Sequence, residues 1–178
     1  MSSIWIMVMA ILNIKDSLTD GIDHINIYSK GQTELGRMLS NFYYLPFECE
    51  DGKFNSIEGY WYWIGNHDDR LRNEFGYAAK RLGKELGQKI TITDEEFKLK
   101  IRIAINIKLL TEPLKTKLIN STLPFDHYYV FGGVVKSAGF KWIIKHIEEA
   151  RSNLKHNESI QLTTQGYNNL KEALYSND

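Results

Sequence analysis

Three long stretches of the chain repeat apolar residues at helical spacing, and this pattern limits the fold more than any other feature. The stretches cover residues 69–85, 94–110 and 137–154. Apolar residues three and four positions apart lie on one face of a helix, and that face needs partners that bury it. Pro113 can open a shorter helix over residues 114–120, because proline suits the first helical turn. The pattern therefore predicts a mainly helical domain.

Strand signals are short and occur in two places. Residues 25–28 alternate apolar and polar side chains, which predicts a short half-buried strand. The pair Asp51-Gly52 favours the positive φ of a tight turn, and the residues on either side of it suit a hairpin. Residues 31–37 are polar and indicate a loop. Together these features predict an α+β fold, a mainly helical single domain with a small antiparallel sheet.

Composition narrows the range of partners. The chain has 178 residues, 43% of them hydrophobic, which is enough for one buried core. Lys plus Arg and Asp plus Glu number 22 each, so no net charge draws the protein to nucleic acid or to an anionic membrane. The apolar run over residues 4–12 is too short to cross a bilayer and lacks the basic leader of a secretory signal. We expect no association with a membrane.

Cysteine and histidine give no sign of a disulfide or a metal. Cys49 is the single cysteine of the chain and cannot form an intramolecular disulfide, so a reducing, cytoplasmic location is expected. The five histidines are scattered without the spacing of a metal site. We expect no metal and no cofactor.

Glu58 is the candidate catalytic residue. It lies in a segment, residues 25–63, that is rich in small polar residues and aromatics. Asn55 or Ser56 would cap a helix that holds Glu58 in its first turn. Aromatic neighbours such as Trp61 would limit solvent access, which raises a carboxyl pKa toward values useful for proton transfer. The alternative is a glutamate that only satisfies the helix terminus.

Candidate ligand contacts cluster in the same segment. Tyr28, Ser29 and Lys30 follow one another at the end of the first predicted strand and offer two hydroxyl groups and one ammonium for a phosphate. Asn41, followed by Phe42, could hold a ribose hydroxyl or a base edge. Each of these has an alternative without a ligand. Residues 28–30 could be polar only for solubility at a strand end, and Asn41 could close a turn with its own side chain.

A second candidate region covers residues 124–133. Tyr129 and its aromatic neighbours could stack on a flat heterocycle, and the Gly132-Gly133 pair could bring backbone amides to an anion. Aromatic clusters more often belong to a core, which is the alternative here.

Six segments resemble, in the same order, the motifs of the NADAR or YbiA-like family. Residues 25–29 are similar to the family's INFYS strand, and residues 39–42 are similar to its FSNF motif. The other matches are the P...DGK.W hairpin at 46–54, the SEHY helix start at 56–60, the AARMGR segment at 77–83 and the YWGDGG loop at 126–133. The resemblance implies a YbiA-like domain over residues 25–154, an N-terminal extension over 1–24 and a C-terminal helical extension over 155–178.

The resemblance also implies a function and places Glu58 on the family's glutamate. Members are N-glycosidases acting on ADP-ribose and riboflavin-pathway nucleotides, so the expected substrate is a small-molecule nucleotide or ADP-ribose conjugate, with ADP-ribosylated nucleic acid as a further candidate. Glu58 would be the key carboxylate near the anomeric carbon. The assigned contacts are Asn41 on the ribose or base, Tyr28 and Lys30 on hydroxyl or phosphate groups, and Trp61 and Tyr129 stacked on the base.

Four departures from the family pattern keep a second function open. Gly59, Tyr62, Phe131 and Lys136 stand where the family has a histidine, a glutamine, the loop aspartate and an asparagine. Losing the loop aspartate removes a negative charge that could stabilise a cationic sugar. The alternative is therefore a non-hydrolytic protein that binds a nucleotide or an ADP-ribose derivative. A third possibility is an interaction protein that kept the fold without the pocket.

Overall fold

Six α-helices are the main regular elements over residues 16–156, the part of the chain that the computed structural model describes. They are α2 (Glu34–Leu39), α3 (Ile57–Ile64), α4 (Gly76–Leu86), α5 (Asp94–Leu109), α6 (Leu114–Asn120) and α7 (Lys141–Lys155). Two short 3-10 helices, η1 (Ser17–Thr19) and η2 (Asp69–Asn73), accompany them.

The strands of this part of the chain form three separate two-stranded ribbons. In the first, β1 (Ile25–Asn26) pairs in parallel with β4 (Phe125–Asp126). The other two are antiparallel hairpins, β2 (Phe47–Cys49) with β3 (Gly52–Phe54) and β5 (Tyr128–Phe131) with β6 (Val134–Ser137). The mainly helical α+β domain that the sequence predicts is confirmed, with one parallel pair beside its antiparallel ones.

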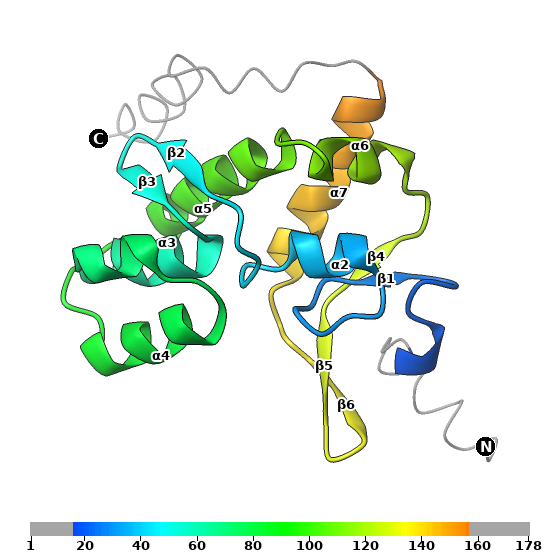
Figure 1. Cartoon of the computed structure of the whole chain (residues 1–178), viewed down its shortest axis with the longest axis horizontal. Helices are drawn as coiled ribbons and strands as arrows, with labels where there is room; N and C mark the ends of the chain where they lie inside the picture. Colours follow the sequence, from blue (N-terminus) through cyan, green and yellow to red (C-terminus); the bar gives the residue numbers. More distant parts are fainter. Residues whose placement is uncertain (1–15, 157–178) are drawn as a thin grey trace.

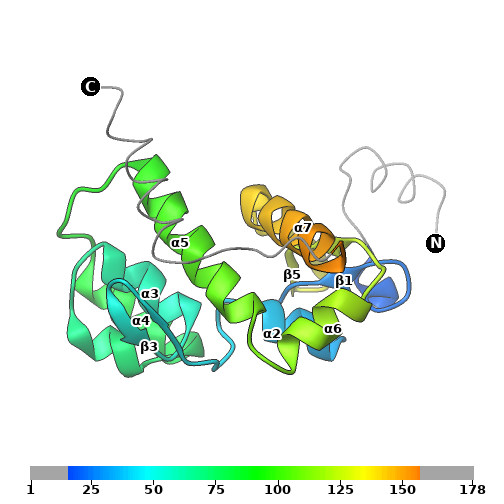
Figure 2. The ribbon, with the colours of Figure 1, turned by 90° about the horizontal axis from the view of Figure 1, so that it is seen from above.

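Helix α5 is the centre of the molecule. In Figure 2 it runs between one group of elements made of α3, α4 and the β2–β3 hairpin and another made of α2, α6, α7 and β1. It contacts α3, α6 and α7, so both groups pack on it. Its residues Ile101, Ala104, Ile105 and Leu109 are buried. The β5–β6 hairpin projects away from the helices (Figure 1).

Side-chain caps start the helices where local chemistry favours them. Thr33, Ser56 and Thr93 precede α2, α3 and α5, and each hydroxyl accepts a backbone N–H from three residues further on, at 3.0, 3.0 and 3.2 Å. Such a cap satisfies one of the free N–H groups of the first turn. Of the two predicted caps for α3, Ser56 is the one used.

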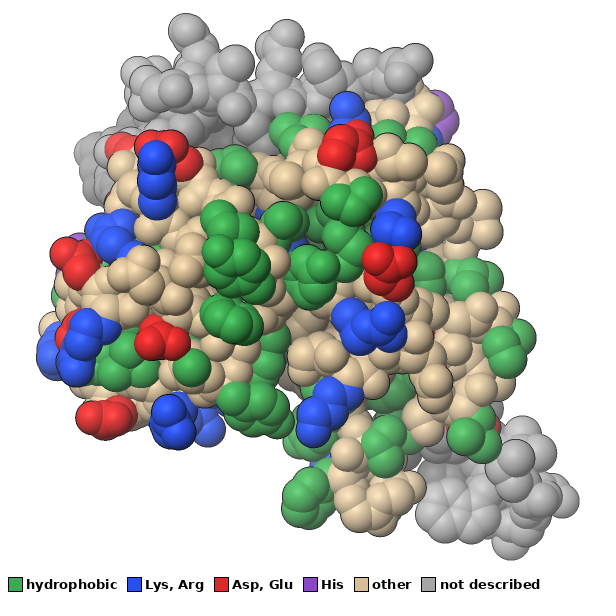
Figure 3. All heavy atoms as spheres, in the orientation of Figure 1, with side chains coloured by type: hydrophobic (Ala, Val, Ile, Leu, Met, Phe, Trp, Pro, Cys, Tyr) green, Lys and Arg blue, Asp and Glu red, His purple; other side chains and the backbone are tan. Residues whose placement is uncertain are grey.

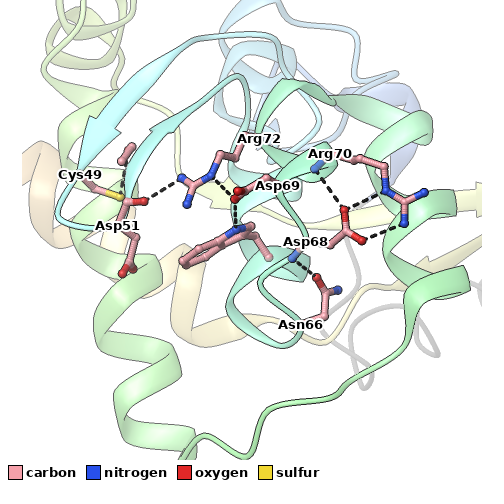
Figure 4. A network of polar contacts seen from close by, with 9 residues as sticks. Cys49, Asp51, Asn66, Asp68, Asp69, Arg70 and Arg72 are labelled. Carbon is pink, nitrogen blue, oxygen red and sulfur yellow. Dashed lines mark hydrogen bonds and ion pairs between the residues drawn. The ribbon is translucent and has the colours of Figure 1, made fainter.

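A polar network fixes η2 against the β2–β3 hairpin (Figure 4). Arg72 donates to the Asp51 carbonyl at 2.7 Å and to the Asp69 carboxylate at 2.6 Å. Its guanidinium also lies over the Phe54 and Trp63 rings, 4.6 and 4.5 Å from their centroids. Cation–π contacts add to the charged hydrogen bonds, so one side chain joins the turn, η2 and α3.

The prediction of one helix over residues 69–85 is wrong. The chain forms η2, turns extended at Glu74 and Phe75, and only then enters α4. Bonds to a distant segment compete with helical ones here, since Asn55 donates its backbone N–H to Arg72 O at 2.9 Å and the Ser56 hydroxyl donates to Glu74 O at 3.0 Å.

Three smaller predictions also need correction. Residues 31–37 are not a loop throughout, because Thr33 caps α2. The strand expected over 25–28 covers only Ile25–Asn26, and it is buried on both faces rather than half-buried, since Asn26 is as inaccessible as its apolar neighbours. The helix predicted over 137–154 begins at Lys141 instead of residue 137, because residues 134–137 pair with β5.

Gly132 and Gly133 turn the β5–β6 hairpin. Their φ angles are 58° and 75°, the left-handed values that a two-residue hairpin turn requires. The sequence marks this region as a break and does not predict its strands.

Two expected segments, the apolar run 4–12 and the C-terminal helical extension, lie outside the described residues apart from the end of α7. None of the helices between residues 16 and 156 combines the length and the apolar character that crossing a bilayer requires.

Candidate functional site

A cavity of about 640 Å³ lies between α3, α4, the segment after β1, the segment after α2, the β5–β6 hairpin and the start of α7. This volume suits a drug-sized or nucleotide-sized ligand. Figure 3 shows hydrophobic side chains gathered down the middle of one face, between the α4 side and the α2 side. At the rim Phe42 packs edge-on against Tyr77, with the ring centroids 5.2 Å apart.

The cavity collects most of the residues that the sequence singles out. Its lining includes Glu58, Tyr28, Ser29, Lys30, Asn41, Phe42, Trp61 and Tyr129. Gly132 and Gly133 are not part of it, because they form the hairpin turn, where a Cβ added to either glycine would meet no heavy atom within 4 Å. The two candidate regions of the sequence, residues 25–63 and 124–133, thus form one site.

Asn26 joins these two regions. Its amide group donates to the Tyr128 carbonyl and accepts from the Tyr128 N–H, both at 3.1 Å. Asp20 fixes the segment from the other side, since its carboxylate accepts the N–H groups of Asn26 at 2.9 Å and Gln32 at 2.7 Å. Residues 28–30 are therefore held beside β5, and Asp20, within the expected N-terminal extension, contributes to that placement.

Glu58 lies in the first turn of α3 and lines the cavity. Its backbone N–H donates to Asn41 O at 3.0 Å, whereas its side chain forms no hydrogen bond or ion pair with any residue between 16 and 156. Only 9% of the residue surface is exposed. Burial raises the pKa of Glu58 to about 7, against the opposing charges of Lys80 and Lys84. Ser56 supplies the helix cap, so the capping alternative for Glu58 has no support.

Glu58 is the single carboxylate among the described residues that line the cavity. Asp126 accepts the His127 N–H at 2.7 Å and does not line the cavity. Phe131 does line it and is 70% exposed. An aromatic ring thus borders the site at the position that the resemblance aligns with an aspartate.

Lys80 is a lining residue that the sequence does not single out. It lies on α4, where its charge lowers the pKa of Glu58, and its ammonium is 5.5 Å from the centroid of the Phe42 ring. The only signal was its place in the segment 77–83, which resembles a family motif. Lys30 and Lys80 together make the cavity attractive to an anionic ligand.

His127 is the second lining residue that the sequence misses. Its Nδ1 is buried and has no hydrogen-bond partner between residues 16 and 156. Burial lowers the pKa of His127, while a backbone hydrogen bond with Ile27 and the charge of Asp126 oppose that shift. Burial therefore favours the neutral imidazole, and its Nδ1 is a buried polar atom without a partner in the described residues.

Close packing of glycines determines the shape of the wall around Glu58. A Cβ on Gly83 would lie 2.0 Å from Cγ of Tyr62, so the Tyr62 ring lies directly on α4. A Cβ on Gly59 would lie 2.4 Å from Leu71 O, which leaves no room for a histidine at this position. Two of the four departures from the family pattern therefore adjoin η2 and α4.

Trp61 is held in an aromatic cluster beside the cavity. Its ring meets Phe97 edge-on at 4.6 Å and Phe140 at 5.3 Å, and stacks on Trp142 at 6.4 Å between centroids. A ring fixed on several sides loses little entropy when a ligand stacks against its free surface.

No protein-family model, no curated protein and no solved structure matches the chain. Within residues 16–156, no group of three or more His, Cys, Asp or Glu side chains is placed to hold a metal ion.

Proposed function

We propose that this protein is an N-glycosidase of the NADAR or YbiA-like kind, which cleaves the N-glycosidic bond of an ADP-ribose-like or ribosylamino nucleotide. The observation that carries the proposal is Glu58, a buried carboxyl group without a partner in the described chain, in the wall of a nucleotide-sized cavity. The cytoplasm is the proposed location, because Cys49 is a free thiol.

The proposed chemistry uses Glu58 in its ionised form. As the bond between the anomeric carbon and the base nitrogen breaks, the electron pair leaves with the base and the ribose ring becomes cationic. A carboxylate in a site shielded from water stabilises that charge more in the transition state than in the ground state. Water then adds to the anomeric carbon, and the Glu58 carboxylate accepts a proton from that water. Glu58 then donates this proton to the released base.

The remaining lining residues provide binding groups for such a substrate. Lys30 and Lys80 would contact phosphate, and Tyr28 and Ser29 offer hydroxyl groups to the ribose or the phosphate. Asn41 would contact the ribose or the base edge. Trp61 and Tyr129 would stack on the base, as aromatic rings do with nucleotides in other sites.

The test is release of the free base from guanine-linked ADP-ribose and from a ribosylamino-pyrimidine phosphate, measured by chromatography. We expect turnover by the wild type and a loss of about 100-fold or more in Glu58→Gln, the usual cost of removing a group that stabilises transition-state charge. Glu85→Gln, at an exposed position of α4, is the matched control and should keep wild-type turnover. Unchanged turnover by Glu58→Gln excludes Glu58 from the reaction.

The second candidate function is binding of the same ligands without hydrolysis. It is favoured by Phe131, which adds stacking surface where the family has an acid and leaves Glu58 without a second carboxylate in the lining. Calorimetry followed by mass spectrometry of the recovered ligand separates the two functions. Tight binding of an unaltered ligand favours the binding protein, whereas recovery of the free base favours the enzyme.

A further inference from the structure

Lys108 is a buried lysine without an acidic partner in the described part of the chain. It lies on α5 with 2% of its surface exposed, among buried apolar residues of the same helix. Its Nζ donates to Ser40 O at 2.7 Å and lies 6.0 Å from the centroid of the Tyr43 ring. Burial lowers the pKa of Lys108 to about 7. Both contacts of the ammonium are to the segment that follows α2.

A lysine in this position is costly for the fold. Removing an ammonium from water without a counter-charge disfavours the folded state, and an apolar side chain of similar length would fill the space without that penalty. Groups that cost stability are concentrated at functional sites. Lys108 contacts such a site, because its hydrogen-bond partner Ser40 lines the cavity.

The peptide between Ser40 and Asn41 connects Lys108 with the cavity. Its carbonyl accepts from Lys108 and also from the Tyr43 N–H at 3.1 Å. The peptide is trans, so its N–H points away from the carbonyl and hence away from Lys108. That N–H belongs to Asn41, a lining residue, and it donates no hydrogen bond within residues 16–156.

The next peptide connects the same segment with Glu58. Asn41 O accepts the Glu58 N–H at 3.0 Å, which fixes the first turn of α3 relative to the segment. Ser40 and Phe42 also line the cavity. Lys108 is therefore linked through two consecutive peptides to the residue that carries the proposed chemistry.

We propose that Lys108 is a positioning residue: by holding the Ser40 carbonyl it orients the Asn41 N–H as a hydrogen-bond donor to an acceptor oxygen of the bound ligand. Two donors on the carbonyl polarise the peptide, and a polarised peptide has a stronger N–H donor. The acceptor is a phosphate or carbonyl oxygen of a nucleotide, and this choice of ligand rests on the proposed function.

The experiment compares Lys108→Met with the wild type in the full chain labelled with ¹⁵N, and follows the Asn41 and Phe42 amide resonances, the melting temperature and the affinity for ADP-ribose. Methionine keeps the length of the side chain and removes the donor. We expect an equal or higher melting temperature at pH 6, displaced or broadened Asn41 and Phe42 resonances, and an affinity about tenfold lower, the worth of one good hydrogen bond. Lys98→Met, also on α5, removes an ion pair with Asp94 and should change neither the Asn41 and Phe42 resonances nor the affinity.

The outcomes separate this role from the proposed function. If wild type binds no ADP-ribose but Lys108→Met displaces the Asn41 resonance, the proposed function fails, whereas the orientation of the Asn41 peptide by Lys108 stands. Unchanged Asn41 and Phe42 resonances in a folded Lys108→Met overturn the role. Lys108→Gln, which keeps a shorter neutral donor, is the second variant if methionine prevents folding. Failure of both variants to fold overturns the proposal, since Lys108 would then be needed for the fold itself.

Discussion

At the scale of single residues, burial and nearby positive charges act in opposite directions on the pKa of Glu58. Burial favours its neutral form, and the ammonium groups of Lys80 and Lys84 favour its ionised form. The result, a pKa of about 7, means that both forms are populated at neutral pH. A group in this state can accept and return a proton with little energetic cost, which is what a water-activating carboxylate has to do.

Activity is expected to rise with pH. If ionised Glu58 stabilises the cationic sugar, kcat/KM should increase through a pKa of about 7 and level off above it. The profile is measured as base release between pH 5 and 9. His127 has a pKa below its ordinary value, so its titration belongs at lower pH, and His127→Gln should leave the limb near pH 7 in place. A rate that falls through pH 7 would assign the reaction to protonated Glu58 instead.

Glu58 should also destabilise the folded protein at high pH. The pKa of Glu58 is about 7 in the folded protein, against 4.5 for an ordinary glutamate such as that of the unfolded chain. Between these two pH values the folded state binds more protons than the unfolded state, so stability falls as pH rises from 4.5 to 7. We expect Glu58→Gln to be more stable than wild type by up to about 3 kcal/mol at pH 8, from 1.36 kcal/mol per pKa unit. The difference should nearly vanish at pH 4.5. Urea unfolding at the two pH values measures it, and equal stability at pH 8 would show that the burial cost is absent.

At the scale of elements, the contact between α3 and α4 sets the position of the cavity wall. Tyr62 lies against Gly83, and Tyr62 is also a lining residue. Burial and the charge of Glu58 raise the pKa of the Tyr62 hydroxyl, which keeps it a neutral hydrogen-bond donor beside the carboxylate. The close approach of two helices therefore has a direct effect on the site.

Gly83→Ala is expected to displace Tyr62. The new methyl group would overlap the ring, and overpacking of this kind typically costs about 1–3 kcal/mol, more than the helix propensity that alanine adds. Thermal unfolding should report the loss, and calorimetry should show weaker binding of ADP-ribose. Gly65→Ala is the control, because its Cβ would meet the nearest atom at 3.6 Å and its backbone is already helical. Wild-type stability and binding in Gly83→Ala would mean that Tyr62 can move without consequence.

Features determined by local chemistry could be predicted from the sequence. Ser56 and Thr93 cap their helices, Asp51-Gly52 turns a hairpin and Pro113 precedes α6, as expected. The break between η2 and α4 could not be predicted, because the Ser56 hydroxyl that competes for it is 18 residues away.

The part of the site that depends on local sequence was also predictable. Glu58 and its neighbours stand close together in sequence, and their residue types alone suggested a site. Lys80 and His127 could not be found this way, since only the packing of α4 on α3 and the pairing of β1 with β4 bring them to the cavity. Lys108 meets Ser40 across 68 residues of chain. No local pattern indicates that contact.

At the scale of the whole molecule, the cavity is formed by elements from both sides of α5, and the β5–β6 hairpin closes part of it. The hairpin strands pair only with each other within residues 16–156. Tyr129, Val130 and Phe131 are exposed on one side of the turn and line the cavity. Tyr128 at the base of the hairpin is buried, but residues 129–137 beyond it form an arm that contributes to the site while adding little to the core.

Shortening the arm should reduce ligand binding without unfolding the protein. Tyr129 pairs with Lys136, so residues 130–135 can be replaced by Asn-Gly, which suits a two-residue hairpin turn between paired positions. We expect a nearly unchanged melting temperature, because Val130, Phe131 and Val134 are all exposed. The affinity for ADP-ribose should fall by about tenfold, since a base stacked on an aromatic ring contributes about 1–3 kcal/mol. Phe131→Ala alone should account for most of that loss. Wild-type affinity in the shortened protein would exclude residues 130–135, Phe131 included, from the ligand contacts and leave Tyr129 as the aromatic contact of the hairpin.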